Sequence, residues 1–205
     1  MSSPEESPLA PTSPARSVPW LAEAERIDLA VYAAIAGTET PHLDRAMRRL
    51  SQAADYSRLS ILAGAVLAVT GGPRGRRAAA SGLASVATTA TIVNALVKPL
   101  GRRHRPDRAA EDVPLGRQVR MPRSPSFPSG HTAAAVAFAT GVGRVMPGAG
   151  VPLHVLATLV AYSRVHTGVH YPGDVLAGAL LGATISELTP LPSGGRLRAR
   201  SCQSR

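Results

Sequence analysis

Cysteine is almost missing from this chain. The single cysteine, Cys202, lies near the carboxyl end, so neither a disulfide framework nor a cysteine-ligated metal site is available. Aromatic residues are also scarce, at seven among 205 residues, although 44% of the chain is hydrophobic. Because alanine and glycine supply much of that fraction, we expect helices that pack by close backbone approach, which is a habit of membrane bundles.

The sequence also has no internal repeat and no run of alternating β-branched residues, which argues against a sheet. It has six apolar runs instead, at residues 27–37, 59–72, 78–97, 132–142, 151–162 and 175–188. The run at 78–97 carries no charge, and about 20 residues at a rise of about 1.5 Å just cross a hydrocarbon core. Residues 42–55 predict an amphipathic connecting helix. Several runs are too short to span alone, so a soluble helical bundle is the alternative.

Acidic residues are few, and the 23 basic residues outnumber the 13 acidic ones, for a net charge of +10. This excess indicates an anionic partner, which leaves nucleic acid, acidic lipid and a phosphorylated substrate open.

The domain prediction has three parts. Residues 1–19, rich in proline and serine, predict a disordered leader without a signal peptide. Residues 20–189 predict one helical domain, and 190–205 a basic tail.

Three short motifs carry candidate chemistry. In "KPLGRRHRP", Pro99 disfavours a helical Lys98 and Gly101 frees the turn, so Lys98 and Arg105 can converge on one anion. The neighbouring arginines, Arg102, Arg103 and Arg108, are expected to meet lipid headgroups instead.

In "PSGH", Ser129 is expected to cap a helix with its hydroxyl, Gly130 to open the approach to the helix amides, and His131 to stand at the first turn. An ordinary capped helix with a surface histidine is the alternative.

In "SRVHTGVHYPGD", Arg164 adds a forked donor for phosphate oxygens. A Pro-Gly turn can bring Asp174 to His170, where a carboxylate would fix the tautomer of a nucleophilic imidazole. Asp174 can instead, or in addition, cap the last helix.

Together these motifs resemble the three-part signature of the type-2 phosphatidic acid phosphatase superfamily, which includes lipid phosphate phosphatases, bacterial acid phosphatases and vanadium-dependent haloperoxidases. Eleven positions match: Lys98, Arg105, Pro106, Pro128, Ser129, Gly130, His131, Ser163, Arg164, His170 and Asp174. The resemblance implies an all-α fold, a six-helix membrane bundle with the acid phosphatase/vanadium haloperoxidase-like core. It also implies a multi-pass protein of the cell membrane.

The resemblance further implies a metal-independent phosphatase without a cofactor, acting on a lipid phosphate in the bilayer, with no nucleic acid and no inferred protein partner. Lys98, Arg105 and Arg164, with the Ser129 hydroxyl and the Gly130 amide, would bind the phosphoryl oxygens. His170 would attack phosphorus, oriented by Asp174, and His131 would protonate the leaving alcohol and then activate water. Phosphatidic acid, phosphatidylglycerol phosphate and a polyprenyl phosphate or pyrophosphate all suit such a site. A polyprenyl-linked phosphate is favoured, since small-residue helices suit a slender chain.

Other functions share parts of this pattern. A lipid phosphotransferase would use the same residues, a vanadate-dependent haloperoxidase a similar anion site, and a non-enzymatic binder of anionic lipid or nucleic acid only the charge. Among the other histidines, His104 and His166 lie within the motif stretches and are expected to have solvated or supporting roles. His42 and His154 are isolated, and His154, inside an apolar run, can be a hydrogen-bonded interior residue without a metal site.

Overall fold

In a computed structural model, the structure describes residues 18–101 and 103–192, and this part of the chain folds into helices joined by loops, without a strand. The longer helices are α1 (Pro19–Ala36), α2 (Pro41–Ala53), α3 (Arg58–Thr70), α4 (Gly72–Ile92), α6 (Gly130–Gly143), α7 (Pro147–His166) and α8 (Pro172–Leu188). Short helical segments are η1 (Asp55–Ser57), η2 (Val93–Val97), α5 (Lys98–Leu100) and η3 (Leu115–Arg117). All six predicted helices and the connecting helix therefore form.

Prolines mark where these helices begin. Proline stands in the first positions of α1, α2, α4, α7 and α8, where its missing N–H would have no partner in any case. Pro19 already belongs to α1, at the edge of the predicted leader, and the rest of that leader lies outside the described residues. Most of the predicted tail and Cys202 lie outside them as well.

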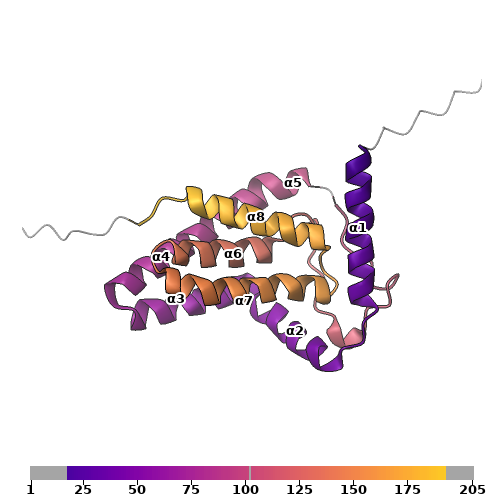
Figure 1. Cartoon of the computed structure of the whole chain (residues 1–205), viewed down its shortest axis with the longest axis horizontal. Coiled ribbons are helices and arrows are strands. Elements are labelled where there is room, and N and C mark those ends of the chain that lie inside the picture. Colours follow the sequence, from indigo (N-terminus) through magenta and orange to yellow (C-terminus); the bar gives the residue numbers. More distant parts are fainter. Residues whose placement is uncertain (1–17, 102, 193–205) are drawn as a thin grey trace, which may run out of the picture.

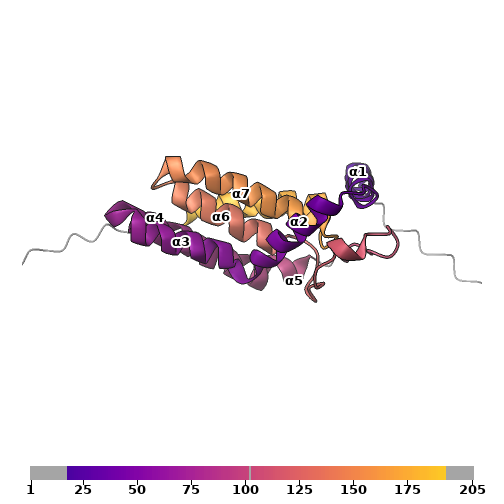
Figure 2. The ribbon, with the colours of Figure 1, turned by 90° about the horizontal axis from the view of Figure 1, so that it is seen from below.

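Five helices, α3, α4, α6, α7 and α8, run lengthwise beside one another, with α6 in contact with α4, α7 and α8 (Figures 1 and 2). Helix α1 instead crosses one end of the bundle at a steep angle, and α2 runs obliquely below that end (Figure 1). The predicted run at 27–37 thus lies in a helix that covers the bundle end. This is the end at which α6 and α8 begin and α7 finishes.

Small residues let the lengthwise helices touch. A side chain on Gly178 would lie 2.5 Å from the carbonyl oxygen of Ser129, and one on Gly182 would lie 2.3 Å from that of Ala133. The expected packing by backbone approach is therefore present between α8 and α6. Buried serines and threonines complete this interior, as in the hydrogen bond from Ser186 Oγ to Ser85 Oγ at 3.0 Å.

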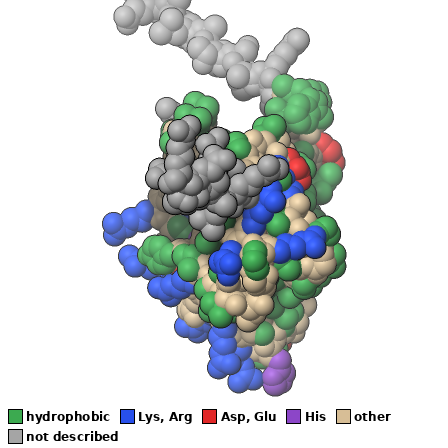
Figure 3. Space-filling model, turned by 90° about the vertical axis from the view of Figure 1, so that its left-hand side faces the viewer, with side chains coloured by type: hydrophobic (Ala, Val, Ile, Leu, Met, Phe, Trp, Pro, Cys, Tyr) green, Lys and Arg blue, Asp and Glu red, His purple; other side chains and the backbone are tan. Residues whose placement is uncertain are grey.

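Many large apolar side chains lie on the outside of the bundle, although Phe138, Val142 and Ile185 are buried within it. Exposed examples follow α3, α7 and α8: Ile61, Leu62, Val66, Val69, Val151, Val155, Leu159, Leu176, Leu180 and Leu188. By length and composition, residues Gly72–Leu100 form the one described helix that could cross a membrane unaided. Arginines gather at the end remote from α1, where Arg74, Arg76 and Arg77 open α4 and Arg144 follows α6 (Figure 3). An apolar girdle with a cationic end is typical of a bundle surrounded by lipid.

Candidate active site

The first motif reaches the site through a widened helical turn. Helix α4 continues through the π-helical η2 into α5, and Lys98 is helical with φ −61° and ψ −39°. The expectation that Pro99 would keep Lys98 out of a helix is therefore wrong. A π turn already departs from the regular hydrogen-bond ladder, so it can accommodate a proline that has no N–H to donate. Gly101 then ends the helix in an extended conformation.

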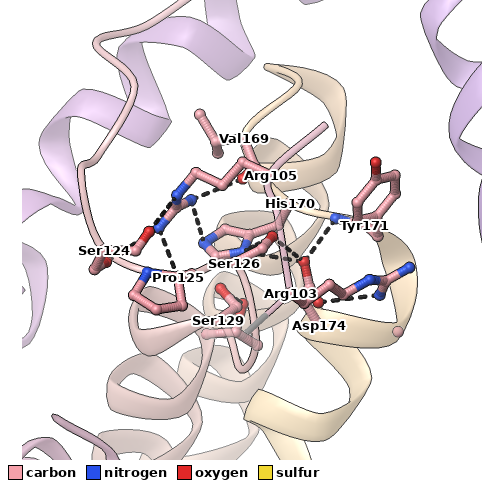
Figure 4. A network of polar contacts seen from close by, with 12 residues as sticks. Arg103, Arg105, Ser124, Pro125, Ser126, Ser129, Val169, His170, Tyr171 and Asp174 are labelled. Carbon is pink, nitrogen blue, oxygen red and sulfur yellow. Dashed lines mark hydrogen bonds and ion pairs between the residues drawn. The ribbon is translucent and has the colours of Figure 1, made fainter. Parts of the chain in front are cut away.

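Arg105 is the centre of the hydrogen-bond network in Figure 4. Its guanidinium donates to the carbonyl oxygens of Ser124 at 2.9 Å and Val169 at 2.8 Å, and its Nη1 lies 3.3 Å from Nε2 of His170. Lys98 Nζ donates to Ser124 Oγ at 3.2 Å, which places the two cations around one serine. The expected convergence of Lys98 and Arg105 is present.

His170 is held between Arg105 and Asp174. A guanidinium can only donate, so Nε2 of His170 accepts and is the unprotonated nitrogen, and Nδ1 faces Asp174 Oδ2 at 3.4 Å. Burial lowers the pKa of His170 to about 4, and the positive charges of Arg105 and Arg164 act in the same direction against Asp174. The imidazole is therefore neutral near pH 7, with a lone pair on Nε2 directed at a cation.

The Asp174 carboxylate contacts the His170 ring and also caps the start of α8. Its Oδ2 accepts from the backbone N–H of Tyr171 at 3.0 Å, which closes the first turn of α8, and it also accepts from Ser126 Oγ. On the other oxygen, Arg103 Nη1 donates at 3.1 Å, and the same Nη1 lies 2.6 Å from Oδ2 of Asp28 on α1. Both roles weighed for Asp174 are thus combined, and α1 is tied to the site.

The second motif opens α6 as expected, but its serine acts differently. Ser129 is the N-cap residue without a side-chain capping bond, because its fully buried hydroxyl accepts from Thr132 Oγ1 at 3.0 Å. The predicted capping hydroxyl is therefore wrong. Gly130 lies against Lys98, since a side chain there would be 3.5 Å from Nζ. The Lys98 ammonium group therefore lies next to the N-terminus of α6.

His131 and Arg164 both approach the carboxylate of Asp55, a residue outside the three motifs. His131 Nε2 lies 2.9 Å from Asp55 Oδ1, and Arg164 Nη1 lies 4.0 Å from the same oxygen. Arg164 is almost fully buried and donates to Ser51 Oγ. The turn after Asp55 is strained, because Tyr56 and Ser57 have φ values of 55° and 57°, and Tyr56 is 83% exposed. Strain at an exposed tyrosine indicates a constraint other than packing.

Two cavities border His131. One of about 200 Å³ lies between α3, α4 and α6, and its lining includes Lys98, Gly130 and His131 together with alanines and Val93. A second, of about 340 Å³, is lined by residues 55, 56, 120–123 and 131. His170 and Arg164 are buried and line neither of these cavities.

Several contacts escaped the motif reasoning. Arg103 and Arg108, expected at headgroups, are half-buried in the site instead, and Arg108 donates to the carbonyl oxygens of Gly168 at 3.1 Å and Val119 at 2.7 Å. Arg102, of which the same was expected, lies outside the described residues. His166 has a supporting role, since its Nε2 lies 2.8 Å from Oδ1 of Asp44 on α2. His42, His104 and His154 are exposed. The interior position considered for His154 is therefore wrong, although its ring does contact Thr140 Oγ1 and the Gly150 carbonyl oxygen. No group of three metal-ligating acidic, histidine or cysteine side chains occurs among the described residues.

Comparisons with known proteins agree on one family. The sequence model of the PAP2 superfamily matches residues 79–191. The decaprenylphosphoryl-5-phosphoribose phosphatase of Mycobacterium tuberculosis is 43% identical over 115 residues, which are 56% of this chain and 61% of that protein. The match thus spans about three fifths of the curated relative.

Solved structures extend the likeness beyond the matched segment. Aquifex aeolicus LpxE superposes with a TM-score of 0.65 at 25% identity, over 80% of this chain and 94% of that one. A transmembrane PAP2-type phosphatidylglycerolphosphate phosphatase from Bacillus subtilis gives 0.61 at 26% identity, over 82% and 84%. The similarity therefore covers the helical arrangement as well as the motifs.

Proposed function

Because this chain belongs to the PAP2 superfamily, we propose that it is a membrane enzyme that hydrolyses the phosphate ester or diphosphate of a lipid through a phosphohistidine intermediate. The single observation that carries the proposal is the contact of His170 Nε2 with the guanidinium of Arg105. When the Arg105 guanidinium holds a phosphoryl group, the unprotonated Nε2 of His170 next to it is in position to attack the phosphorus.

The binding step uses three cations. Lys98, Arg105 and Arg164 hold the phosphoryl oxygens, and a phosphate oxygen replaces the present contact between Arg105 and His170. The Gly130 amide at the start of α6 adds a donor with the positive end of the helix dipole. Ser129 Oγ accepts from Thr132 and so keeps its own proton for a phosphate oxygen. These donors stabilise the charge on the equatorial oxygens during transfer.

The chemical steps follow from the two histidines. His170 Nε2 forms a bond to phosphorus in line with the bond that breaks to the lipid oxygen, while Asp174 stabilises the charge on the ring. His131 gives a proton to the departing oxygen, which leaves as the lipid alcohol, or as a lipid phosphate from a diphosphate. The neutral His131 then takes a proton from water, whose oxygen attacks the phosphohistidine and releases phosphate. No metal takes part.

Substitution of Asp55 by asparagine should lower kcat/KM by roughly tenfold or more and leave KM nearly unchanged, because Asp55 acts through His131. Burial lowers the pKa of the His131 imidazole to about 4, Arg164 and Lys98 act in the same direction, and the Asp55 carboxylate opposes them. Loss of that carboxylate in Asp55→Asn should lower the pKa further, so the alkaline limb of the pH–rate profile should move to lower pH. The charged groups around His131 are Asp55 from η1, Lys98 from α5, Arg164 from α7, and Arg120 and Arg123 from the loop before α6. Asp55→Glu should restore the profile; an unshifted limb in Asp55→Asn would leave the aspartate a structural role only.

The lipid chain is proposed to enter the apolar cavity between α3, α4 and α6. Its walls include Ala90, Val93, Ala133 and Ala134, with Lys98 and His131 at the polar edge. Small side chains of this kind suit a slender polyprenyl chain, and the similar Mycobacterium tuberculosis protein is named for a decaprenyl substrate. We therefore favour a polyprenyl-linked phosphate over a diacylglycerol phosphate.

The protein is proposed to be a multi-pass protein of the cell membrane. Support comes from the exposed apolar faces of α3, α7 and α8, and from the similar Bacillus subtilis structure, which is described as transmembrane. Helix α1 then lies along the membrane surface, with Trp20 at 68% exposure, because it crosses the end of the lengthwise helices. Tryptophan is enriched at that depth of a membrane.

The deciding experiment supplies the purified protein with polyprenyl phosphate, polyprenyl diphosphate and phosphatidic acid in detergent, with and without a chelator, and measures released phosphate. We expect release that the chelator does not change. An added acceptor lipid, followed by product analysis, separates hydrolysis from phosphotransfer. Absence of phosphate release from every lipid would refute the proposed function.

A further inference from the structure

Helix α1 brings a buried carboxylate to the turn that carries Asp174. Asp28 is 8% exposed, and its two oxygens have different partners. Oδ1 accepts from the backbone N–H of Gly173 at 2.6 Å, and Oδ2 lies 2.6 Å from Nη1 of Arg103. A side chain on residue 173 would lie 3.0 Å from Oδ2 of Asp28, so the glycine leaves room for this carboxylate.

The Arg103 guanidinium lies between two carboxylates. Its Nη1 donates to Asp174 Oδ1 at 3.1 Å, and the other oxygen of Asp174 faces His170 (Figure 4). The guanidinium carbon also lies 4.1 Å from the ring centroid of Tyr171, which restricts where the arginine can move. The two carboxylates and one guanidinium give this group of side chains a net charge of −1, next to the His170 ring.

The Asp28 charge changes what Asp174 can do for His170. When Nε2 of His170 bonds to phosphorus, the ring becomes positive, and Asp174 is its counter-charge. Arg103 alone would neutralise Asp174 and so weaken that counter-charge. Asp28 offsets the charge of Arg103, which leaves the negative charge of Asp174 available to the ring.

Attachment of α1 to the bundle does not by itself explain these charges. Helix α1 already packs through Tyr32 and Ala36, which join Val165 of α7 and Val175 of α8 in one buried apolar cluster. Desolvation of a buried ion pair offsets much of its attraction, so apolar contacts hold two helices together at least as well. A carboxylate at this place in α1 therefore indicates a role in the chemistry of the site.

We propose that Asp28 is a positioning residue for the nucleophile: it holds the turn that carries Asp174, offsets the charge of Arg103, and thereby maintains the counter-charge of the phosphorylated ring. Asp28 acts through Arg103 and Asp174 and does not touch the substrate. Helix α1, which lies outside the three motifs, is then required for full activity. This inference rests on the proposed function, in which His170 is the nucleophile.

The first measurement compares Asp28→Asn with the unchanged protein on the best lipid of the panel. The asparagine keeps an oxygen for the Gly173 N–H but removes the charge. We expect kcat/KM, which reports phosphoryl transfer to His170, to fall roughly fivefold. The inhibition constant of inorganic phosphate should stay within about twofold, because the phosphate-binding cations are unchanged. As a matched control, Glu25→Gln removes a charge from an exposed position of the same helix and should change neither value.

The pH dependence separates this role from a purely structural one. Burial lowers the pKa of His170 to about 4, and the charged groups that face the ring are Asp174 from α8, Arg105 from the loop after α5 and Arg164 from α7. Only the neutral ring attacks phosphorus, so kcat/KM falls as the pH drops through this pKa. Each change of charge behind Asp174 should therefore move the acid limb of the profile.

The two single variants should move that limb in opposite directions. Loss of the negative charge in Asp28→Asn lowers the pKa of His170, so the limb moves to lower pH by about half a pH unit. Loss of the positive charge in Arg103→Gln raises the pKa, so the limb moves to higher pH. The double variant should return the limb close to its starting position. Imidazole NMR signals in detergent, assigned by comparison with His170→Ala, measure the same pKa without activity.

Three outcomes would contradict these expectations. Shifts of both single variants in the same direction, or no shift in either, would overturn the positioning role. Lower activity of Asp28→Asn with a lower unfolding temperature and an unmoved acid limb would make Asp28 an anchor of α1 only, and would also overturn it. Failure of the unchanged protein to release phosphate from any lipid would instead refute the proposed function.

Discussion

Replacement of His170 by alanine is expected to remove phosphate release almost completely, by on the order of 10⁴-fold or more. Nε2 of this residue is the atom proposed to bond to phosphorus, and no other described histidine contacts Arg105. The loss should fall on kcat, because Lys98, Arg105 and Arg164 still bind the phosphate. The measurement is phosphate release from the best lipid of the panel, with substrate affinity determined separately.

A matched control and a folding check accompany this variant. His104 lies in the loop of the first motif with an exposed side chain, so His104→Ala should keep full activity. His170 is buried, so its removal can disturb α8, and circular dichroism and thermal unfolding should establish that the variant is folded. A folded His170→Ala variant that retains activity would exclude the phosphohistidine.

Replacement of His131 by alanine should lower the rate on a lipid phosphate by about 10²–10⁴-fold, the usual contribution of general acid–base catalysis. The size of the loss should depend on the leaving group. A lipid alkoxide needs a proton in order to leave, whereas p-nitrophenolate does not, so the first step on p-nitrophenyl phosphate should be affected much less.

The same variant should accumulate the intermediate. Without a base to activate water, the phosphohistidine formed from p-nitrophenyl phosphate should persist, which gives a burst of nitrophenolate followed by slow turnover. Radioactive phosphate should then remain on the protein in alkali and be lost in acid, as expected for a phosphorus–nitrogen bond. Equal losses on both substrates, with no burst and no labelled protein, would remove His131 from both proton transfers.

Local patterns were enough to predict the helices and the convergence of the motifs. The apolar runs predicted all six helices, because each helix buries or exposes a continuous apolar face. The prolines indicate where the helices begin. The motif spacing brought Lys98, Arg105, His170 and Asp174 to one place. Functional residues at a fixed spacing within one loop or turn can be recognised in a single sequence.

Contacts between distant segments left a weaker signal. Asp55 meets His131 across 76 positions, and Arg103 meets Asp174 across 71. One signal was present for Asp28: a carboxylate that interrupts an apolar run indicates a buried partner, and here Arg103 is that partner. This ion pair and the hydrogen bond from the Gly173 N–H to Asp28 Oδ1 join α1 to the bundle end, and periodicity alone does not predict such contacts.

The contact between α6 and α8 has a consequence for how the sequence of this protein can vary. Main chain meets main chain at Gly178 and Gly182, and the Ser129 amide donates to the Asp174 carbonyl oxygen at 2.9 Å. The distance between the turn that opens α6 and the Asp174 carboxylate is therefore set by contacts between backbones, which a side-chain substitution does not change. The backbone–backbone hydrogen bonds of residues 107–123 are made within that loop, so the sequence of the loop can change while that distance stays fixed.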